Sequence, residues 1–314
     1  MGRWTGTAVL LLLAMLWGTM VPTISHLLKT WDPLFLAALR YLGGGPALLP
    51  VLWLMGRGAR PAAPSVPFWR AGLLGALGIG GYAGLFTLGV AHANPVTAAI
   101  LTAAGPAVAT VTDRVIFGRP VNPHMLPGLI LAICGCVVAT VDFHRDGNPF
   151  DLRGGEILIL AAVACWSWYS SGAQRWLKGW SQLRISCVTM TIGGVALTIL
   201  YLVMAALGTI PFPPPAPPSG EDFAILVWLV LVLVSIGVVM WNIGVQRNGV
   251  VTASLYLNLT PIVAILILSL GGTPPNLQQV IGGGMVIAGI LWAELATMRN
   301  ASPPPAGIDE APGL

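Results

Sequence analysis

Ten aromatic and polar side chains lie deep inside apolar stretches of the chain, where they could form a binding site. They are Trp17, Tyr82, Thr102, Trp166, Trp168, Tyr169, Trp241, Asn242, Tyr256 and Asn258. A tryptophan ring offers a large apolar surface with one N–H donor, and an asparagine amide both donates and accepts hydrogen bonds. Together such groups suit a small, partly apolar solute. Each also has a structural alternative, because buried rings pack and buried amides form hydrogen bonds between helices.

Arg40 is an eleventh candidate, because it lies within an apolar stretch rather than at its end. Its guanidinium could bind an anionic group of a substrate, or it could reach the membrane interface or pair with backbone carbonyls. The acidic residues Asp113, Asp142, Glu156 and Glu294 lie near the ends of apolar stretches, where we expect contact with water or lipid headgroups. No proton relay is therefore visible, and facilitated diffusion or exchange is as plausible as proton coupling.

The composition excludes a soluble protein. Of the 314 residues, 56% are hydrophobic and only 8% are charged, and the mean hydropathy is +0.82. Soluble domains carry about 25% charged residues, so the sequence indicates an integral membrane protein. The basic residues are scattered and form no patch for nucleic acid. Neither the histidines nor the four cysteines have the spacing of a metal or redox site, and we expect no catalytic residue, metal or cofactor.

Ten apolar segments are long enough to cross a membrane, which takes about 20 residues per helix. Their approximate ranges are 6–27, 33–55, 69–91, 95–117, 124–142, 155–173, 183–207, 223–246, 250–270 and 277–298. With the N-terminus inside, eleven lysine and arginine residues fall in cytoplasmic segments and three in outer ones. This bias predicts that both termini are cytoplasmic. The proline-rich tail at 301–314 is expected to be disordered.

A repeated stretch predicts the arrangement of these helices. Residues 93–118 recur 155 positions later, so that Pro106 corresponds to Pro261. Proline inside a helix removes a hydrogen bond and bends it, and we expect hinges at both residues. Five spans in each half invert the second half, which predicts two inverted five-helix repeats at 1–147 and 148–300. Glycines at a seven-residue spacing in the fifth and tenth spans predict close packing, either within the chain or in a homodimer.

Several soft motifs in this order resemble the drug/metabolite transporter superfamily, and within it the EamA-type members. They are Trp17-Gly18, Arg40-Tyr41, the mid-helix Pro106 and Pro261, and the glycine-rich fifth and tenth spans. The segment 241–244, reading WNIG, is similar to amino-acid exporters of the YddG kind. The chain departs from many EamA-type members by lacking a glutamate just after the fourth and ninth spans. No role of those glutamates can therefore be transferred to it.

The resemblance implies export of amino acids or related metabolites through a bacterial inner membrane. The two halves would rock around a midplane cavity, with a small-molecule substrate and the lipid bilayer as partners. A metabolite or nucleotide-sugar exchanger is an alternative, but phosphates favour several basic residues and only Arg40 is available. A lipid-modifying membrane enzyme is a remote alternative, because it would need clustered acid, base or metal-binding residues.

Overall fold

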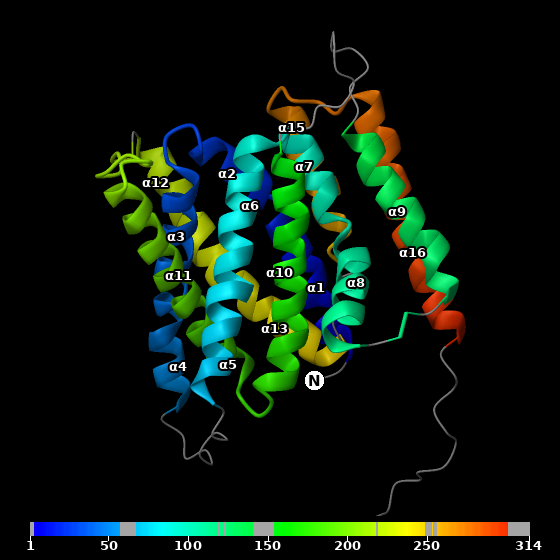
Figure 1. Cartoon of the computed structure of the whole chain (residues 1–314), viewed down its shortest axis with the longest axis horizontal. Helices are drawn as coiled ribbons and strands as arrows, with labels where there is room; N and C mark the ends of the chain where they lie inside the picture. The colour runs from blue at the N-terminus through cyan, green and yellow to red at the C-terminus, as the bar shows by residue number, and fades with distance from the viewer. Residues whose placement is uncertain are drawn as a thin grey trace, which may run out of the picture.

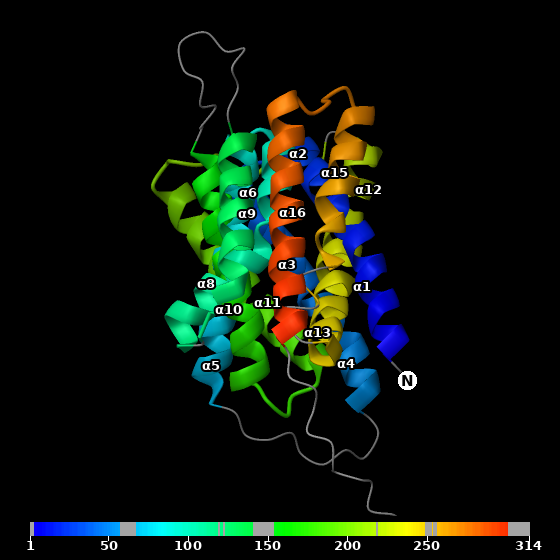
Figure 2. The same ribbon diagram turned by 90° about the vertical axis from the view of Figure 1, so that its right-hand side faces the viewer.

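The chain folds into one bundle of helices that stand side by side (Figures 1 and 2). A computed structural model describes residues 3–56, 67–118, 120–121, 123–140, 154–217, 219–248, 253 and 256–300. All regular secondary structure in these ranges is helical. The N-terminus lies at one end of the bundle, which is also where α13 and α16 end (Figure 1).

The helices follow one another along the chain, and most of them are joined by short connections. They are α1 (Arg3–Gly18), α2 (Met20–Leu27), α3 (Pro33–Gly44), α4 (Leu49–Gly56), α5 (Phe68–Leu73), α6 (Gly81–His92), α7 (Pro95–Thr102), α8 (Gly105–Phe117), α9 (Leu126–Ala139), α10 (Gly155–Trp176), α11 (Gln182–Ala206), α12 (Gly220–Val227), α13 (Gly237–Asn248), α15 (Leu259–Leu270) and α16 (Leu277–Asn300).

Five helical stretches in the described ranges are long and apolar enough to cross a membrane. They are Gly6–Leu27, Pro33–Leu54, Phe68–His92, Gln182–Ala206 and Gly220–Asn248. The bent pair α7 and α8 would add a sixth, and three further apolar helices are shorter. The structure thus confirms the predicted all-helical fold, with several helices able to span a membrane, while the count of ten spans stays a prediction.

The helix that contains Pro106 is broken. Helices α7 and α8 meet at an angle of 53°, with Ala103 and Ala104 in the turn between them. Proline at 106 has no N–H to offer the Thr102 carbonyl, and its ring crowds that carbonyl. The predicted bend is therefore present, and it begins before the proline itself. Pro261 lies in the first turn of α15, and much of the segment before it falls outside the described residues.

Two stretches carry π-helical hydrogen bonding, which the sequence did not predict. They are Leu74–Gly80, between α5 and α6, and Trp228–Ile236, between α12 and α13. Both lie in the third predicted span of their half. A π-helical turn changes the register of the backbone hydrogen bonds and is frequent at functional sites.

Helices α9 and α16 pack along a seam of glycines. A Cβ atom added at Gly135 would lie 2.6 Å from the Gly282 carbonyl oxygen, and one added at Gly128 would meet the Gly289 carbonyl. Such close backbone approach is the reason for small residues on membrane helix faces. The predicted packing face is confirmed, and it is used within the chain. A homodimer through these two helices stays a prediction and would have to use their other faces.

One expectation about the acidic residues was wrong. Glu156 is only 3% exposed, although its place near the end of a span suggested contact with water. The start of α10 is covered because Gly155 packs backbone to backbone against Gly89 and Ala93 of the α6 end. The Asp142 position, the Glu294 side chain and the tail at 301–314 lie outside the described residues.

Candidate functional site

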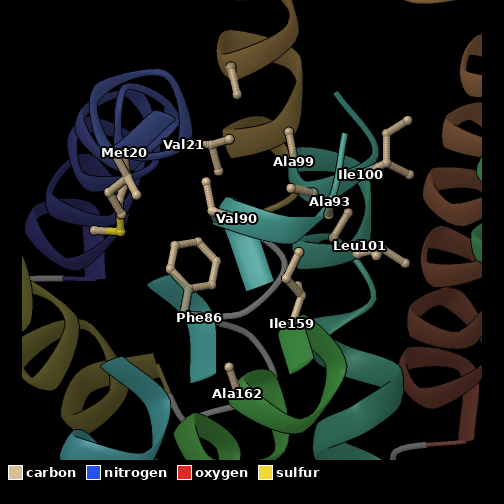
Figure 3. Packing of buried hydrophobic residues seen from close by; sticks show 14 of the residues in the cluster. Met20, Val21, Phe86, Val90, Ala93, Ala99, Ile100, Leu101, Ile159 and Ala162 are labelled. Atoms are coloured by element: carbon tan, nitrogen blue, oxygen red, sulfur yellow. The ribbon is translucent and has the colours of Figure 1, made fainter. Parts of the chain in front are cut away.

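A cavity of about 750 Å³ of space free of protein atoms opens between helices from both halves of the chain. Part of this space is open to the surroundings of the bundle. Helices α1, α2, α6, α7, α8, α10 and α13 and the segment entering α15 contribute to its wall. The lining residues are Trp17, Met20, Val21, Tyr82, Phe86, Thr102, Gly105, Pro106, Val163, Trp166, Ser167, Trp241, Leu257, Asn258 and Thr260. Figure 3 shows Met20, Val21 and Phe86 within the surrounding hydrophobic cluster.

Aromatic rings form one side of the cavity. The ring centroids of Trp17, Trp166 and Trp241 lie 5.5–5.9 Å apart. Tyr82 extends the group, with its ring 4.9 Å from Trp166 and 5.4 Å from Phe86. Tilted and edge-to-face contacts at these distances stabilise aromatic clusters. The rings therefore make a continuous apolar wall contributed by four helices.

Two of these indoles are fixed by hydrogen bonds that point away from a ligand. The Trp17 Nε1 donates to the Leu233 carbonyl at 2.9 Å, and Leu233 belongs to the second π-helical stretch. The Trp241 Nε1 donates to Ser170 Oγ at 3.0 Å. Because both N–H donors are satisfied, these rings offer apolar surface rather than hydrogen bonds to a substrate.

The Asn258 amide is a buried polar group of the wall that lacks partners. Its Nδ2 and Oδ1 atoms are both buried, and neither makes a hydrogen bond. The hydroxyls of Thr102 and Ser167 instead donate to carbonyls of their own helices, at 2.6 and 2.8 Å. A buried polar atom without a partner is rare and costly, so the free amide marks a place for a ligand or a water molecule.

Five of the predicted site residues lie behind this wall. Asn242 donates from Nδ2 to Tyr169 Oη at 3.1 Å and to Ser186 Oγ at 2.7 Å. It thereby ties α13 to α10 and α11. Trp168 packs edge-on against Trp176, and the Tyr256 hydroxyl lies 3.3 Å from Thr7 Oγ1. Arg40 is fully buried in α3, next to the cavity residue Met20.

Six predicted binding residues do line the cavity, and they come together from distant parts of the chain: Trp17, Tyr82, Thr102, Trp166, Trp241 and Asn258. The predicted hinge Pro106 joins them. The sequence reasoning missed mainly apolar members, among them Met20, Val21, Phe86, Val163 and Leu257. Nothing in their residue types distinguishes them from packing residues. Gly105 could have been predicted as a lining residue, because it lies next to Pro106 at the predicted bend.

Metal binding finds no support in the part of the chain that the structure describes, where no three histidine, cysteine or acidic side chains come together around a possible ion. The wall of the cavity has the character of a binding site for a partly apolar molecule.

The comparison with known families settles the class of protein. The EamA-like transporter family matches residues 4–141 and again residues 153–294. The chain belongs to this family. Two consecutive matches cover most of the chain, and the family consists of transporters rather than enzymes.

Curated relatives of this EamA-family protein carry transporter names. The "Probable terminal-alkyne amino-acid exporter" of Streptantibioticus cattleyicolor is 29% identical over 78% of this chain and 80% of its own length. The "Aromatic amino acid exporter YddG" of Ancylobacter novellus is 23% identical over 95% of this chain and its full length. The "Uncharacterized inner membrane transporter YedA" of Escherichia coli K12 is 25% identical over 90% of this chain and 88% of its own length.

A solved crystal structure shares the fold. It superimposes with a TM-score of 0.66 over 96% of this chain and the whole of the other, at 21% sequence identity. The EamA family is a multi-pass membrane family, and this likeness supports the same arrangement of helices here.

Proposed function

We propose that this protein exports amino acids or closely related small organic metabolites by alternating access around the aromatic cavity. The observation that carries the proposal is the Asn258 amide, which has no partner inside a wall of rings. Leaving a buried polar group unpaired costs about 1–3 kcal/mol, which a substrate donor and acceptor would recover. A free amino acid presents both an ammonium donor and a carboxylate acceptor.

The rings suit the side chain of such a substrate. Trp17, Trp166 and Trp241 present apolar surface, and Tyr82 and Phe86 continue it. An aliphatic or aromatic side chain would bury its surface there at about 25 cal/mol per Å². Two relatives that are named as amino-acid exporters support this substrate class.

The proposed movement uses the two halves of the chain. The tandem family match supports two repeats, which we place at 1–147 and 148–300. Five spans in each half would give the repeats opposite orientations. Residues of both halves line the cavity, so rocking of one half against the other would change access to it. The broken helix at α7 and α8 and the corresponding Pro261 are the proposed hinges. The inner-membrane relative and the basic residues support a bacterial inner membrane with cytoplasmic termini.

An exchanger for nucleotide sugars or other phosphorylated metabolites has less support. Among the described residues that line the cavity there is no lysine or arginine. A pyrophosphate group would find at most Arg40, behind Met20, to compensate its several charges in an apolar site.

The test is transport by the purified protein in liposomes, with labelled phenylalanine, leucine and a phosphorylated sugar as separate solutes. We expect uptake of at least one amino acid and none of the phosphorylated sugar. Asn258→Ala should lower the initial rate by tenfold or more, while Asn248→Ala, outside the cavity, should leave it within twofold. Transport of the sugar but of neither amino acid would overturn the proposal. Comparing rates with and without a pH gradient would decide whether protons are coupled.

A further inference from the structure

Arg40 is a buried cation without a counter-charge. Its side chain is 0% exposed, and its Nη1 donates to Thr87 Oγ1 at 2.9 Å. Its Nη2 lies 3.8 Å from the Met20 sulfur, and its Nε has no hydrogen-bond partner. No carboxylate of the described residues forms an ion pair with it; the ion pair found among them joins His26 and Asp222.

The guanidinium cannot remove its own uncompensated charge. It stays protonated in proteins, so it cannot become neutral as a buried lysine does. Full burial also prevents it from reaching water or headgroups along its own stem. The ring of the neighbouring Tyr41, 5.5 Å from Arg40 Cζ, gives only partial compensation. Three of its five N–H groups find no acceptor, and an anion could use them.

Met20 separates this cation from the cavity. Its side chain is 6% exposed and belongs to the cavity wall (Figure 3). The same sulfur lies 3.8 Å from Arg40 Nη2 and 3.9 Å from Tyr82 Oη. A thioether is a weak acceptor on a flexible, unbranched chain. One soft side chain thus occupies the point toward which a guanidinium and a phenol both direct hydrogens.

We propose that Arg40 and Tyr82 form a carboxylate subsite, which Met20 covers while the cavity is empty. The carboxylate of a substrate displaces the Met20 sulfur and accepts hydrogen bonds from Arg40 Nη2 and Tyr82 Oη. Charge-assisted hydrogen bonds to a carboxylate are roughly twice as strong as neutral ones, so the exchange is favourable. This inference rests on the proposed function, because it assigns one end of the amino acid, and it predicts discrimination against molecules without a carboxylate.

The test compares two probes that share a ring and differ in charge, phenylacetate and phenethylamine. Their affinities are measured by calorimetry on purified protein, independently of transport. Wild-type protein should bind phenylacetate at least tenfold more tightly than phenethylamine. Arg40→Met should lower the affinity for phenylacetate tenfold or more and leave that for phenethylamine within twofold. Arg114→Met, an exposed arginine, serves as the matched control.

A second variant tests the cover directly. Met20→Ala should raise the ratio of phenylacetate to phenethylamine affinity by threefold or more, because no sulfur has to be displaced. Met15→Ala, a half-exposed methionine on the preceding helix, should leave that ratio unchanged. The Arg40→Met protein without ligand should keep or raise its melting temperature, since an unpaired charge is removed.

The outcomes separate this inference from the proposed function. Failure of wild-type protein to prefer phenylacetate would overturn the subsite, as would equal losses of both probes in Arg40→Met together with a lower melting temperature. Suppose that Arg40→Met and Met20→Ala both keep phenylalanine transport and the wild-type ratio of phenylacetate to phenethylamine affinity. This result would exclude the subsite and leave the proposed function standing. Carboxylate preference that depends on Arg40, without transport of any amino acid, would support the subsite and contradict the exporter.

Discussion

Small residues close the seam between α9 and α16, whereas large residues hold open the cavity between the other helices. At the seam, Gly128 and Gly135 bring backbone against backbone at Gly289 and Gly282. At the cavity, large rings keep the helices apart, and the Asn258 amide has no partner. Small residues give many weak contacts that cannot be rearranged cheaply. Large residues around the amide leave space beside it, and a ligand in that space could form the hydrogen bonds that the amide lacks.

The contrast also separates two kinds of glycine. An added Cβ at the seam would meet the backbone of the facing helix, which cannot move without moving the whole helix. An added Cβ at Gly237, beside the cavity, would meet the end of the Trp17 side chain at 2.5 Å. The Trp17 ring could shift only by giving up its hydrogen bond to the Leu233 carbonyl, which is still a smaller change than moving a whole helix. The seam is therefore rigid, and the cavity wall tolerates more rearrangement than the seam does.

The largest expected effect comes from placing a methyl group in the seam. The Cβ of Gly282→Ala would lie 2.5 Å from both Ala139 N and the Gly135 carbonyl oxygen. Overpacking typically costs about 1–3 kcal/mol, and contact with two backbone atoms of α9 favours the upper end, about 3 kcal/mol. We expect a clear fall in melting temperature, measured in detergent by tryptophan fluorescence.

Gly284→Ala on the same helix is the matched control for this change. A Cβ there meets nothing within 4 Å, and alanine favours the helix by about 0.8–1.0 kcal/mol over glycine. Its melting temperature should stay level or rise. Equal destabilisation by both substitutions would mean that the seam is no tighter than the lipid-facing side of α16.

The two asparagines provide the next contrast. Asn242 Nδ2 donates hydrogen bonds to Tyr169 and Ser186, whereas the Asn258 side chain makes no hydrogen bond. Asn242→Ala should therefore destabilise the protein by about 1 kcal/mol, the usual worth of a hydrogen bond between membrane helices. Asn258→Leu should leave the melting temperature of the empty protein unchanged or higher, because an unsatisfied amide is removed.

Transport rates measured on the same two variants sharpen the comparison. Asn242→Ala should keep most of the wild-type rate once the folded fraction is corrected for, and Asn258→Leu should lose most of it. The opposite pattern, with Asn258→Leu unstable and Asn242→Ala inactive but stable, would exchange the roles of the two residues.

The roles of these two asparagines could not be predicted from the sequence. Both lie at similar depth in apolar stretches, and both are equally able to bind a substrate or to join helices. The choice depends on which neighbours the fold supplies, and Tyr169 and Ser186 come from 73 and 56 positions away in the chain. By contrast, the depth of Trp17, Trp166 and Trp241 sufficed to predict that they face the centre of the bundle.

Local chemistry decided how well each element could be predicted. The bend before Pro106 follows from one missing N–H, and the start of α3 follows from Asp32, whose Oδ1 accepts from Leu34 N at 2.8 Å next to Pro33. The π-helical stretch at Leu74–Gly80 contains no proline, and its residues are ordinary for a membrane helix. A Cβ at Gly75 would lie 2.8 Å from the Thr189 carbonyl oxygen, so contacts with α11 accompany this change of register.

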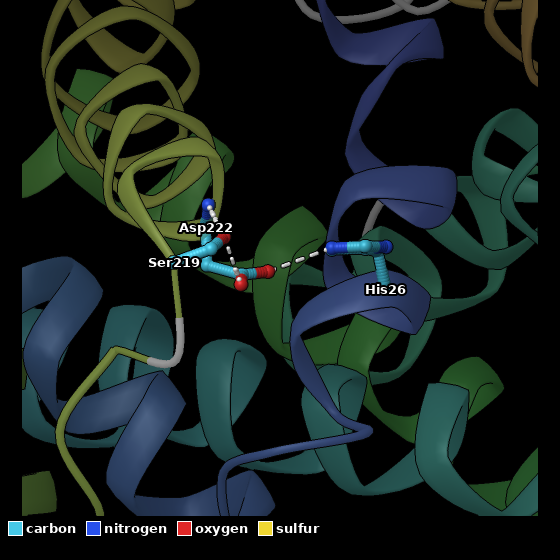
Figure 4. A network of polar contacts seen from close by, with 3 residues as sticks. All are labelled: His26, Ser219 and Asp222. Carbon is cyan, nitrogen blue, oxygen red and sulfur yellow. Dashed lines mark hydrogen bonds and ion pairs between the residues drawn. The ribbon is translucent and has the colours of Figure 1, made fainter.

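The smallest expected effect lies at the end of the bundle opposite the N-terminus. His26 Nε2 on α2 lies 2.8 Å from Asp222 Oδ1 on α12, and Ser219 Oγ donates to the other carboxylate oxygen at 2.6 Å (Figure 4). The His26 side chain is 43% exposed, and exposed pairs contribute little to stability. Like the seam, this contact joins the two proposed halves, but here water can replace the contact.

A contact of this kind can break during a transport cycle at little cost. If the halves separate at this end, His26→Ala should leave the melting temperature unchanged and raise the initial rate of amino-acid uptake into liposomes by up to threefold. Glu221→Ala, an exposed carboxylate beside Asp222, should leave the rate unaltered. A lower rate in His26→Ala would show that the contact supports the active conformation. The contrast between a rigid seam and a breakable contact at this end of the bundle would then be wrong.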